Sequence, residues 1–299
     1  MELSSISSNP LYETRLGIIF YFYQDPEKIK VKIKRLLKDF KNLSNKDYIY
    51  YSHNSLDEFK NIPENGVEFL EKEIGNMDFN ESQHLIAVDS TKERMHTIRV
   101  EMMLRTIKED FKSKTPNWIY FELSPYISYS EVLSFVKNAF YDMTYHYSCC
   151  NFVIGQNDNY LKRSSSYAIK ALKETSIFND QYSILFNPSL LKSLKDKIDG
   201  PNYIQVLSKE LYEKIGFENI FNKCEEADIY YEFGEDYVIF SLSKDKLIKS
   251  ENELFEKYVM LNELISPIIG EIDKPIMYWD DDEWVQWRNR FLDKSKDVS

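Results

Sequence analysis

The sequence predicts an α+β fold with a mixed, largely antiparallel sheet and flanking helices. Strand-like and helix-like segments are intermixed along the whole chain. Gly234-Glu235-Asp236 separates two alternating apolar runs and is typical of a hairpin, which favours this class over a parallel, doubly wound sheet. With 299 residues, 43% of them hydrophobic, the chain has ample material for a core. We therefore predict one large domain over residues 1–299, with two lobes at about 1–155 and 156–299 as the alternative division.

The first half of the chain contains two well-marked blocks. Thr14–Tyr23 is rich in β-branched and aromatic residues and predicts a first strand. Asp25-Pro26 then supplies a cap and a first-turn proline for a helix, whose apolar residues from Ile29 to Phe40 follow at helical spacing. The second block is predicted as strand, helix and strand, at Trp118–Leu123, Ser128–Tyr145 and Asn151–Gly155. Shorter elements are expected between the blocks: strands near Tyr48–Tyr51, Leu85–Val88 and Thr97–Leu104, and a helix over Glu64–Ile74.

The second half is divided by Gly200-Pro201, which ends one predicted helix and precedes another. The second of these helices is predicted over Tyr203–Ile215 and stops at Gly216, since glycine commonly follows a helix C-terminus. A last helix is predicted from Asp280, where Glu283 stands at capping-box spacing. The remaining predicted elements are the strands Ile229–Phe233 and Tyr237–Leu242 and the helices Tyr167–Thr175, Leu190–Ile198 and Glu251–Ile265.

The spacing of the eight glycines excludes several cofactor-binding and catalytic motifs. The closest two, Gly66 and Gly75, are nine residues apart. A dinucleotide fingerprint, a phosphate-binding Walker loop and a nucleophile elbow all need glycines much closer together, because only bare backbone can approach a phosphate or make the sharp turn. We expect no cofactor.

Histidine and cysteine usage also indicates no metal or nucleophile site. The four histidines do not occur at metal-ligand spacing, and no pair of cysteines is spaced for zinc. His146 followed by Cys149 could suggest a base and its nucleophile, but the surrounding residues are more typical of a helix end that leads into a buried strand. The odd count of three cysteines predicts no disulfide framework and a cytoplasmic location. No apolar run is long enough to span a membrane.

Negative charge is concentrated in the last quarter of the chain. Residues 225–299 contain 19 acidic and 9 basic residues, a net charge of −10, whereas the whole chain has a net charge of −11. Such a field repels nucleic acid and attracts basic partners, although acidic residues also serve solubility alone. We therefore expect a basic protein partner, and neither nucleic acid nor a membrane.

Two segments carry a resemblance to a known family. Gly200-Pro201-Asn202-Tyr203-Ile204-Gln205-Val206-Leu207, followed by Leu211 and Ile215-Gly216, resembles the Gly-x-Asn-Trp-apolar segment and terminal Leu-Gly-Gly of the type VI secretion immunity family, formerly a domain of unknown function. Trp287-Arg288-x-Arg290-Phe291 matches the Trp-x-x-Arg-Phe ending common near that family's C-terminus. The order of elements agrees over about residues 14–291. Tyr203 replaces the usual Trp, and Phe217 replaces the second Gly.

The resemblance implies a cytosolic immunity protein that binds and neutralises a toxin delivered by a contact-dependent secretion system. In characterised branches of the family, the toxin carries a VRR-type nuclease domain. The family has no catalytic residues to transfer to this chain, so the resemblance implies that the protein is not an enzyme.

On this hypothesis, an acidic, aromatic-bearing surface covers the basic groove that a nuclease presents to phosphates. The predicted partner-binding residues are Asp228, Glu232, Glu235, Asp236, Asp281, Asp282 and Trp284. Each also has a purely structural interpretation: Asp281 and Asp282 favour a helix dipole, and a tryptophan in a helical stripe more often packs in a core.

Two other classes of function remain open. Glu225, Glu226 and Asp228 form an acidic cluster that could do acid–base work or hold Mg²⁺ in a hydrolytic or metal-dependent enzyme. No histidine or basic partner accompanies this cluster in the sequence, which weakens the enzyme hypothesis. A structural or adaptor protein of the same secretion apparatus is the third alternative.

Overall fold

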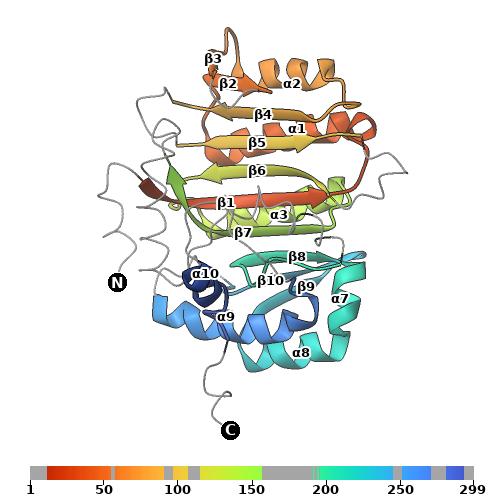
Figure 1. Ribbon diagram of the computed structural model, residues 1–299, viewed down its shortest axis with the longest axis vertical. Helices are drawn as coiled ribbons and strands as arrows, with labels where there is room; N and C mark the ends of the chain where they lie inside the picture. Colours follow the sequence, from red (N-terminus) through yellow and green to blue (C-terminus); the bar gives the residue numbers. More distant parts are fainter. Residues whose placement is uncertain are drawn as a thin grey trace.

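A ten-stranded sheet runs through the computed structural model of the chain from one end to the other (Figure 1). The structure describes residues 12–54, 58–90, 97–106, 115–156, 191, 194, 196–244, 251–270 and 281–292. The strands are β1 (Tyr12–Phe22), β2 (Tyr50–His53), β3 (Lys60–Asn61), β4 (Gln83–Val88), β5 (Arg99–Leu104), β6 (Asn117–Leu123), β7 (Tyr147–Gln156), β8 (Ile204–Ser208), β9 (Tyr230–Phe233) and β10 (Tyr237–Ser241). Their order is β3-β2-β4-β5-β6-β1-β7-β8-β10-β9, and every neighbouring pair is antiparallel. The predicted α+β class is confirmed.

Helices cover the two faces of this sheet at different ends (Figure 1). One face carries α1 (Pro26–Ser44), α2 (Gly66–Asn76) and α3 (Tyr129–Asp142). Around the β8-β10-β9 end lie α7 (Lys209–Ile215), α8 (Phe217–Glu226), α9 (Glu251–Ile265), a 3-10 turn (Ser266–Ile268) and α10 (Asp281–Arg288). Adjacent residues of β9 show that α3 and α8 lie on opposite faces: Glu232 pairs with Lys137 of α3, whereas Phe233 stacks on Phe217 of α8.

The core between the sheet and its helices is built from aromatic rings. Phe40 of α1 lies 4.4 Å from Phe121 of β6, and Phe135 of α3 lies 5.9 Å from Phe20 of β1, measured between ring centroids. All four rings are buried. Burial of one such side chain stabilises the fold by about 2–3 kcal/mol, so this cluster holds α1 and α3 on the central strands.

Local capping sets the beginning of helices α1 and α3, and the cap of α1 is the one that the sequence predicts. The Asp25 side chain accepts a hydrogen bond from the Glu27 amide at 3.2 Å, and Pro26 occupies the first turn of α1. The Ser128 hydroxyl accepts one from the Glu131 amide at 3.4 Å at the start of α3. These bonds satisfy backbone donors that a helix N-terminus leaves unpaired.

One predicted helix is wrong in its first half. The segment predicted as helical over Tyr203–Ile215 forms strand β8 and then the short helix α7. Strand β8 is held between β7 and β10, where Gln205 pairs with Cys149 on one side and with Phe240 on the other. Pairing on both edges outweighs the local helical spacing, because each strand residue gains ladder hydrogen bonds and burial.

Helix α8 was not predicted. Gly216, with φ of 89°, ends α7 and directly precedes α8. The sequence predicts only that a helix ends at this glycine. The predicted helices Tyr167–Thr175 and most of Leu190–Ile198 lie outside the described residues. Among the described helices, none is long and apolar enough to cross a bilayer.

The sheet also buries a charged cluster in strands β4 and β5. Arg99 Nη2 lies 2.7 Å from Glu101 Oε2, and His84 Nε2 lies 2.7 Å from Glu101 Oε1. Burial alone would raise the pKa of Glu101, but Arg99 and His84 hold this pKa below its ordinary range. The Glu101 carboxylate therefore stays charged inside the protein because two partners satisfy it.

Candidate functional site

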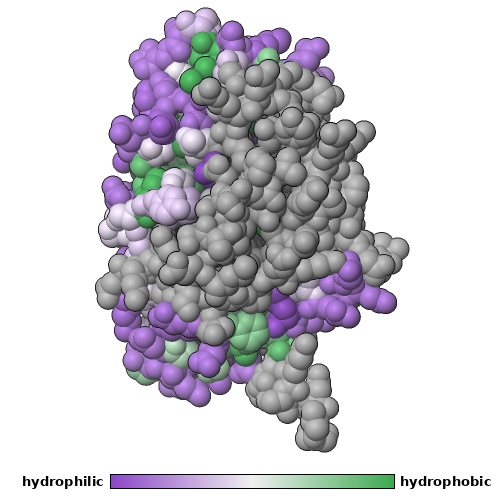
Figure 2. Space-filling view, turned by 90° about the vertical axis from the view of Figure 1, so that its left-hand side faces the viewer, coloured by the Kyte–Doolittle hydropathy of each residue, from purple (hydrophilic) through white to green (hydrophobic). Residues whose placement is uncertain are grey.

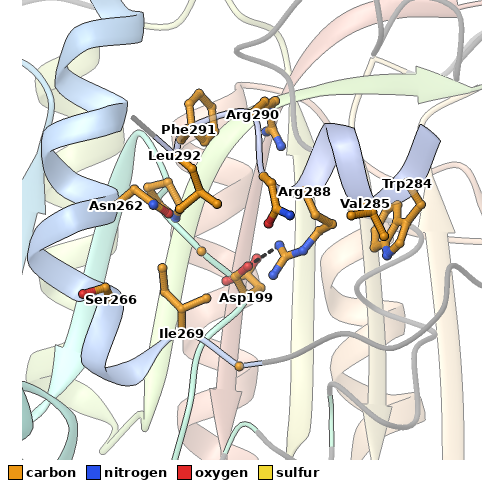
Figure 3. Close-up of a pocket in the computed structure, with 14 residues that line it drawn as sticks. Asp199, Asn262, Ser266, Ile269, Trp284, Val285, Arg288, Arg290, Phe291 and Leu292 are labelled. Carbon is orange, nitrogen blue, oxygen red and sulfur yellow. Dashed lines mark hydrogen bonds between the residues drawn. The ribbon is translucent and has the colours of Figure 1, made fainter. Parts of the chain in front are cut away.

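The two segments that carry the family resemblance meet in space, although they lie more than eighty residues apart. Arg288 of α10 donates a hydrogen bond to the backbone carbonyl of Asp199, directly before Gly200 (Figure 3). Gly200 has φ of 142°, a conformation that side chains disfavour. A Cβ atom at this position would also lie 3.6 Å from Arg288 Nη1. The positive φ at Gly200 therefore favours glycine in this turn, which Arg288 binds through the Asp199 carbonyl.

The asparagine of the motif lies at the centre of a buried hydrogen-bond network. Asn202 Nδ2 donates to the Tyr147 hydroxyl oxygen at 2.7 Å and to the Gly200 carbonyl at 3.0 Å. Its Oδ1 accepts from Asn151 Nδ2 at 3.1 Å. The Tyr258 hydroxyl of α9 in turn donates to Asn151 Oδ1 at 2.7 Å. These bonds join the loop before β8 to strand β7 and helix α9.

Asp199 completes this set, which we name the Asn202 network (Tyr147, Asn151, Asp199, Asn202 and Tyr258). The Tyr147 hydroxyl donates to the Asp199 carboxylate. Burial raises the pKa of Asp199 and lowers the pKa of Arg288, because both groups lose water around their charge. Both pKa shifts reflect desolvation at a packed junction, which indicates a structural role for the network.

A cavity of about 550 Å³ opens beside this junction (Figure 3). Its wall includes Arg288, Trp284 and Phe291 from the C-terminal segment, and Asn262 and Ile269 from α9 and the chain that follows. Neighbouring Arg290 already has partners: its guanidinium carbon lies 3.8 Å from the Trp287 ring centroid, and its Nη1 donates to the Trp287 carbonyl at 2.8 Å. Arg288 therefore attaches α10 to the loop before β8, whereas these contacts of Arg290 lie within the C-terminal segment itself.

The acidic residues predicted to bind a partner lie in two separate places. Asp228 is 73% exposed, and its carboxylate lies 3.3 Å from Lys244 Nζ and 3.4 Å from Lys257 Nζ. Hydrogen bonding to Lys244, together with the charge of Lys257, lowers the pKa of Asp228. Glu232 of β9 pairs with Lys137, and this partner lowers the pKa of Glu232. Both carboxylates are thus charged but already paired within the protein.

Glu235 and Asp236 form the exposed tip of the β9–β10 hairpin. The Asp236 carbonyl accepts a hydrogen bond from the Lys209 amide at 2.8 Å, which places this tip beside the start of α7. Helix α10 is at the other end of strands β8 and β10, next to Asp199 (Figure 1). The structure therefore brings Glu235 and Asp236 together but separates them from the α10 candidates.

The α10 candidates differ in exposure. Asp282 is exposed, and the side chain of Asp281 lies outside the described residues. Trp284 is only 2% exposed and stacks on Trp287 with 5.4 Å between ring centroids. In this conformation Trp284 contributes to packing, and its ring is not open to a partner.

A group of aromatic side chains at the β9 end was not among the predicted site residues. We name it the aromatic patch (Tyr212, Phe217, Phe221, Tyr231 and Phe233). Phe217 and Phe221 are 60% and 47% exposed, and the other three rings are partly exposed. The sequence does contain a signal for it: Phe217 and Phe221 stand at i, i+4 spacing and Tyr231 and Phe233 at i, i+2 spacing.

The remaining sequence candidates for catalysis are the acidic cluster Glu225, Glu226 and Asp228 and the cysteines. Among the described residues, no three histidine, cysteine, aspartate or glutamate side chains are placed to hold a metal ion. Glu225, Glu226 and Asp228 are exposed at the end of α8. All three cysteines are unpaired and buried, and burial raises the pKa of the Cys150 thiol to about 12. A thiol with such a pKa is protonated at neutral pH and is a poor nucleophile.

Comparison with known proteins gives a structural likeness and no sequence match. No family model and no curated protein matches this sequence. Among solved structures, the fold is similar to that of PA0821, a type VI secretion system (T6SS) protein of Pseudomonas aeruginosa, with a TM-score of 0.75. The match covers 96% of this chain and 84% of the other at 10% sequence identity. At this identity the two chains share a fold over nearly the whole length of this one.

Proposed function

We propose that this protein is a T6SS-associated immunity protein that neutralises a cognate toxin by stoichiometric binding in the cytoplasm. The observation that carries the proposal is the fold shared with a T6SS protein over 96% of this chain. The family resemblance, carried by the Gly200–Leu207 and Trp287–Phe291 segments, points independently to the same secretion system.

The role of these segments in the structure supports a binding function rather than a chemical one. Asn202 and Arg288 are used to join β7, β8, α9 and α10. A motif that maintains a scaffold fits a protein whose activity depends on the shape and charge of its surface. The negative charge of residues 225–299 supports a basic partner, such as a nuclease domain whose groove binds phosphate.

The test uses the toxin encoded by the reading frame next to the gene for this chain. Toxin production in a bacterial host should stop growth, and co-production of this protein should restore growth. In vitro, the toxin's activity should fall linearly with added protein and reach zero at about one equivalent. Growth that is not restored would contradict the proposal.

The same titration separates the enzyme alternative from the inhibitor. An enzyme that modifies or degrades the toxin or its substrate acts repeatedly, so it would abolish activity well below one equivalent and with time. Protection that requires a full equivalent and is immediate supports binding alone. The acidic cluster Glu225, Glu226 and Asp228 provides the matching variant. Glu225→Gln/Glu226→Gln removes two carboxylates that chemistry there would need, so with excess variant the protection should still be complete if binding alone protects, whatever the effect on the rate of association.

A further inference from the structure

The end of the sheet at β9 combines three features that the fold itself does not require. Strand β9 is last in the strand order, so no strand in the described part of the chain pairs with its outer edge. The aromatic patch lies against this strand on the α8 face. The surrounding segment, residues 216–236, contains seven acidic residues and one basic residue, a net charge of −6.

The aromatic patch is continuous rather than a set of single exposed rings. Phe217 stacks on Phe233 at 4.8 Å between centroids, and Tyr212 lies 5.6 Å from Phe233. Tyr231 connects the remaining rings, at 6.1 Å from Phe233 and 6.3 Å from Phe221. Single exposed apolar side chains are common on proteins, but contiguous exposed aromatic rings with a polar border are typical of interaction surfaces.

The backbone amide and carbonyl groups of β9 point outward, away from β10, at two residues of the aromatic patch, Tyr231 and Phe233. The Gly234 amide bonds to the Tyr237 carbonyl at 2.9 Å, and Phe233 pairs with Val238. In an antiparallel ladder the bonded and non-bonded pairs alternate, so the amide and carbonyl groups of Tyr231 and Phe233 point away from β10. The outer edge of β9 therefore presents backbone groups beside the aromatic rings.

The charge around the aromatic patch determines which kind of partner fits this surface. Glu218, Glu225, Glu235 and Asp236 are all exposed around the patch. Asp228 and Glu232 are paired with lysines from outside this segment, so the exposed acids carry the argument. Two copies of this chain that meet through the patch would bring these exposed acids of both copies together, which opposes self-association. A basic protein surface gains both steering by the acidic border and burial of the aromatic rings.

We infer that the aromatic patch and the outer edge of β9 form the docking surface for the basic domain of the toxin. This inference rests on the proposed function and locates its contact. It shifts the centre of the contact from the predicted acidic residues and Trp284 to Phe217, Phe221, Tyr231 and Phe233, with Glu235 and Asp236 at its border. Exposed aromatic rings that become buried give the large contributions in protein interfaces, whereas border charges act mainly on the rate of encounter.

The test compares two double variants of equal net charge, with the inactivated toxin of the adjacent reading frame as the probe. Phe217→Lys/Phe221→Lys should weaken binding at least tenfold. The control Val31→Lys/Tyr126→Lys adds the same two charges at side chains that are 79% and 74% exposed on other elements, and it should change binding less than threefold. Circular dichroism and thermal unfolding establish that each variant is folded.

Three further outcomes separate the possibilities. If the natural chain does not bind the toxin, the proposed function itself is wrong. If the natural chain binds and Phe217→Lys/Phe221→Lys binds like the control, only this location is wrong. A dimer of the natural chain in sedimentation equilibrium that the Phe217→Lys/Phe221→Lys variant abolishes would assign the patch to self-association and overturn the inference. Hydrogen exchange on the natural complex gives an independent result, since the Tyr231 and Phe233 amides should gain protection.

Discussion

Asn202 and Tyr147 share a 2.7 Å hydrogen bond that links the loop before β8 to the neighbouring strand β7. Both side chains are buried, and the Tyr147 hydroxyl donates a hydrogen bond to the Asp199 carboxylate. Asn202, in the segment that resembles an immunity family, therefore joins the loop before β8 to strand β7 of the same sheet.

Replacing Asn202 should destabilise the protein strongly. Asn202→Ala removes the partner of Tyr147 and of Asn151 and leaves buried polar groups without hydrogen bonds. We expect the free energy of unfolding to fall by about 2–3 kcal/mol, measured by urea denaturation with tryptophan fluorescence. The exposed Asn42 of α1 provides a matched control, and Asn42→Ala should change this free energy by less than about 0.5 kcal/mol. Equal effects of the two variants would contradict a network role.

Asp199 should make the protein less stable as the pH rises. Burial raises the pKa of Asp199 in the folded state, so the folded protein binds its proton more tightly than the unfolded chain. This contribution is fully present below the unfolded pKa of about 3.9 and is lost as the pH rises through the folded pKa. Asp199→Asn keeps a neutral acceptor for Tyr147, so its stability relative to the natural chain should increase from pH 4 to pH 7. A constant difference across this range is the contrary result.

Glu101 should have the opposite pH dependence. Its folded pKa is depressed by Arg99 and His84, so its contribution to stability is present above the unfolded pKa of about 4.3 and is lost as the pH falls through the folded pKa. Glu101→Gln leaves Arg99 buried without its carboxylate and should cost about 3 kcal/mol at pH 7. The two proteins should become more alike in unfolding free energy at lower pH, which denaturation at a series of pH values measures. A difference in unfolding free energy that does not change with pH would contradict a stabilising role for the charge of Glu101.

A tryptophan at position 203, as in the family that this segment resembles, should not stabilise this chain. Tyr203 is completely buried, with its ring edge-on to Phe152 at 5.6 Å and to Tyr129 at 6.4 Å. An indole is larger than a phenol, so Tyr203→Trp should overpack this site and lower the midpoint of thermal unfolding, at a cost of about 1–3 kcal/mol. Tyr203→Phe tests the hydroxyl separately from the volume. A higher midpoint for Tyr203→Trp would show that the site has room for the larger ring.

Charge reversal at the hairpin tip should slow association with the toxin. Glu235→Lys/Asp236→Lys changes exposed side chains at the border of the aromatic patch, so the association rate constant should fall several-fold at low salt and the dissociation rate constant should change little. Surface plasmon resonance at several salt concentrations measures both constants. The control Glu58→Lys/Glu81→Lys reverses two exposed acids near the β3 and β4 strands. Equal association rates for the two variants would place the contact elsewhere.

Figure 2 shows the side of the molecule that lies at the left in Figure 1. Hydrophilic residues dominate the described surface at its lower end, with small hydrophobic areas among them (Figure 2).

Much of the fold follows from signals within a few residues of each other. Asp25 caps α1 as the sequence predicts, and α3 begins where the sequence predicts a helix, with Ser128 as its cap. Glu251–Ile265 is helical over the predicted range, and the hairpin at 234–236 joins β9 to β10. Caps, turns and periodicity act through nearest neighbours along the chain, so the sequence by itself determines them.

Tertiary structure alone decided the role of the shared motif and the position of the exposed aromatic rings. Ile204–Ser208 became a strand because β7 and β10 pair with it, and Asn202 became buried because Tyr147 and Asn151, about fifty residues earlier, lie opposite it. Phe217 and Phe233 belong to different elements, and only packing of α8 on β9 makes them one surface. Contacts between residues distant in the chain depend on how whole elements pack, and no local pattern in the sequence specifies that packing.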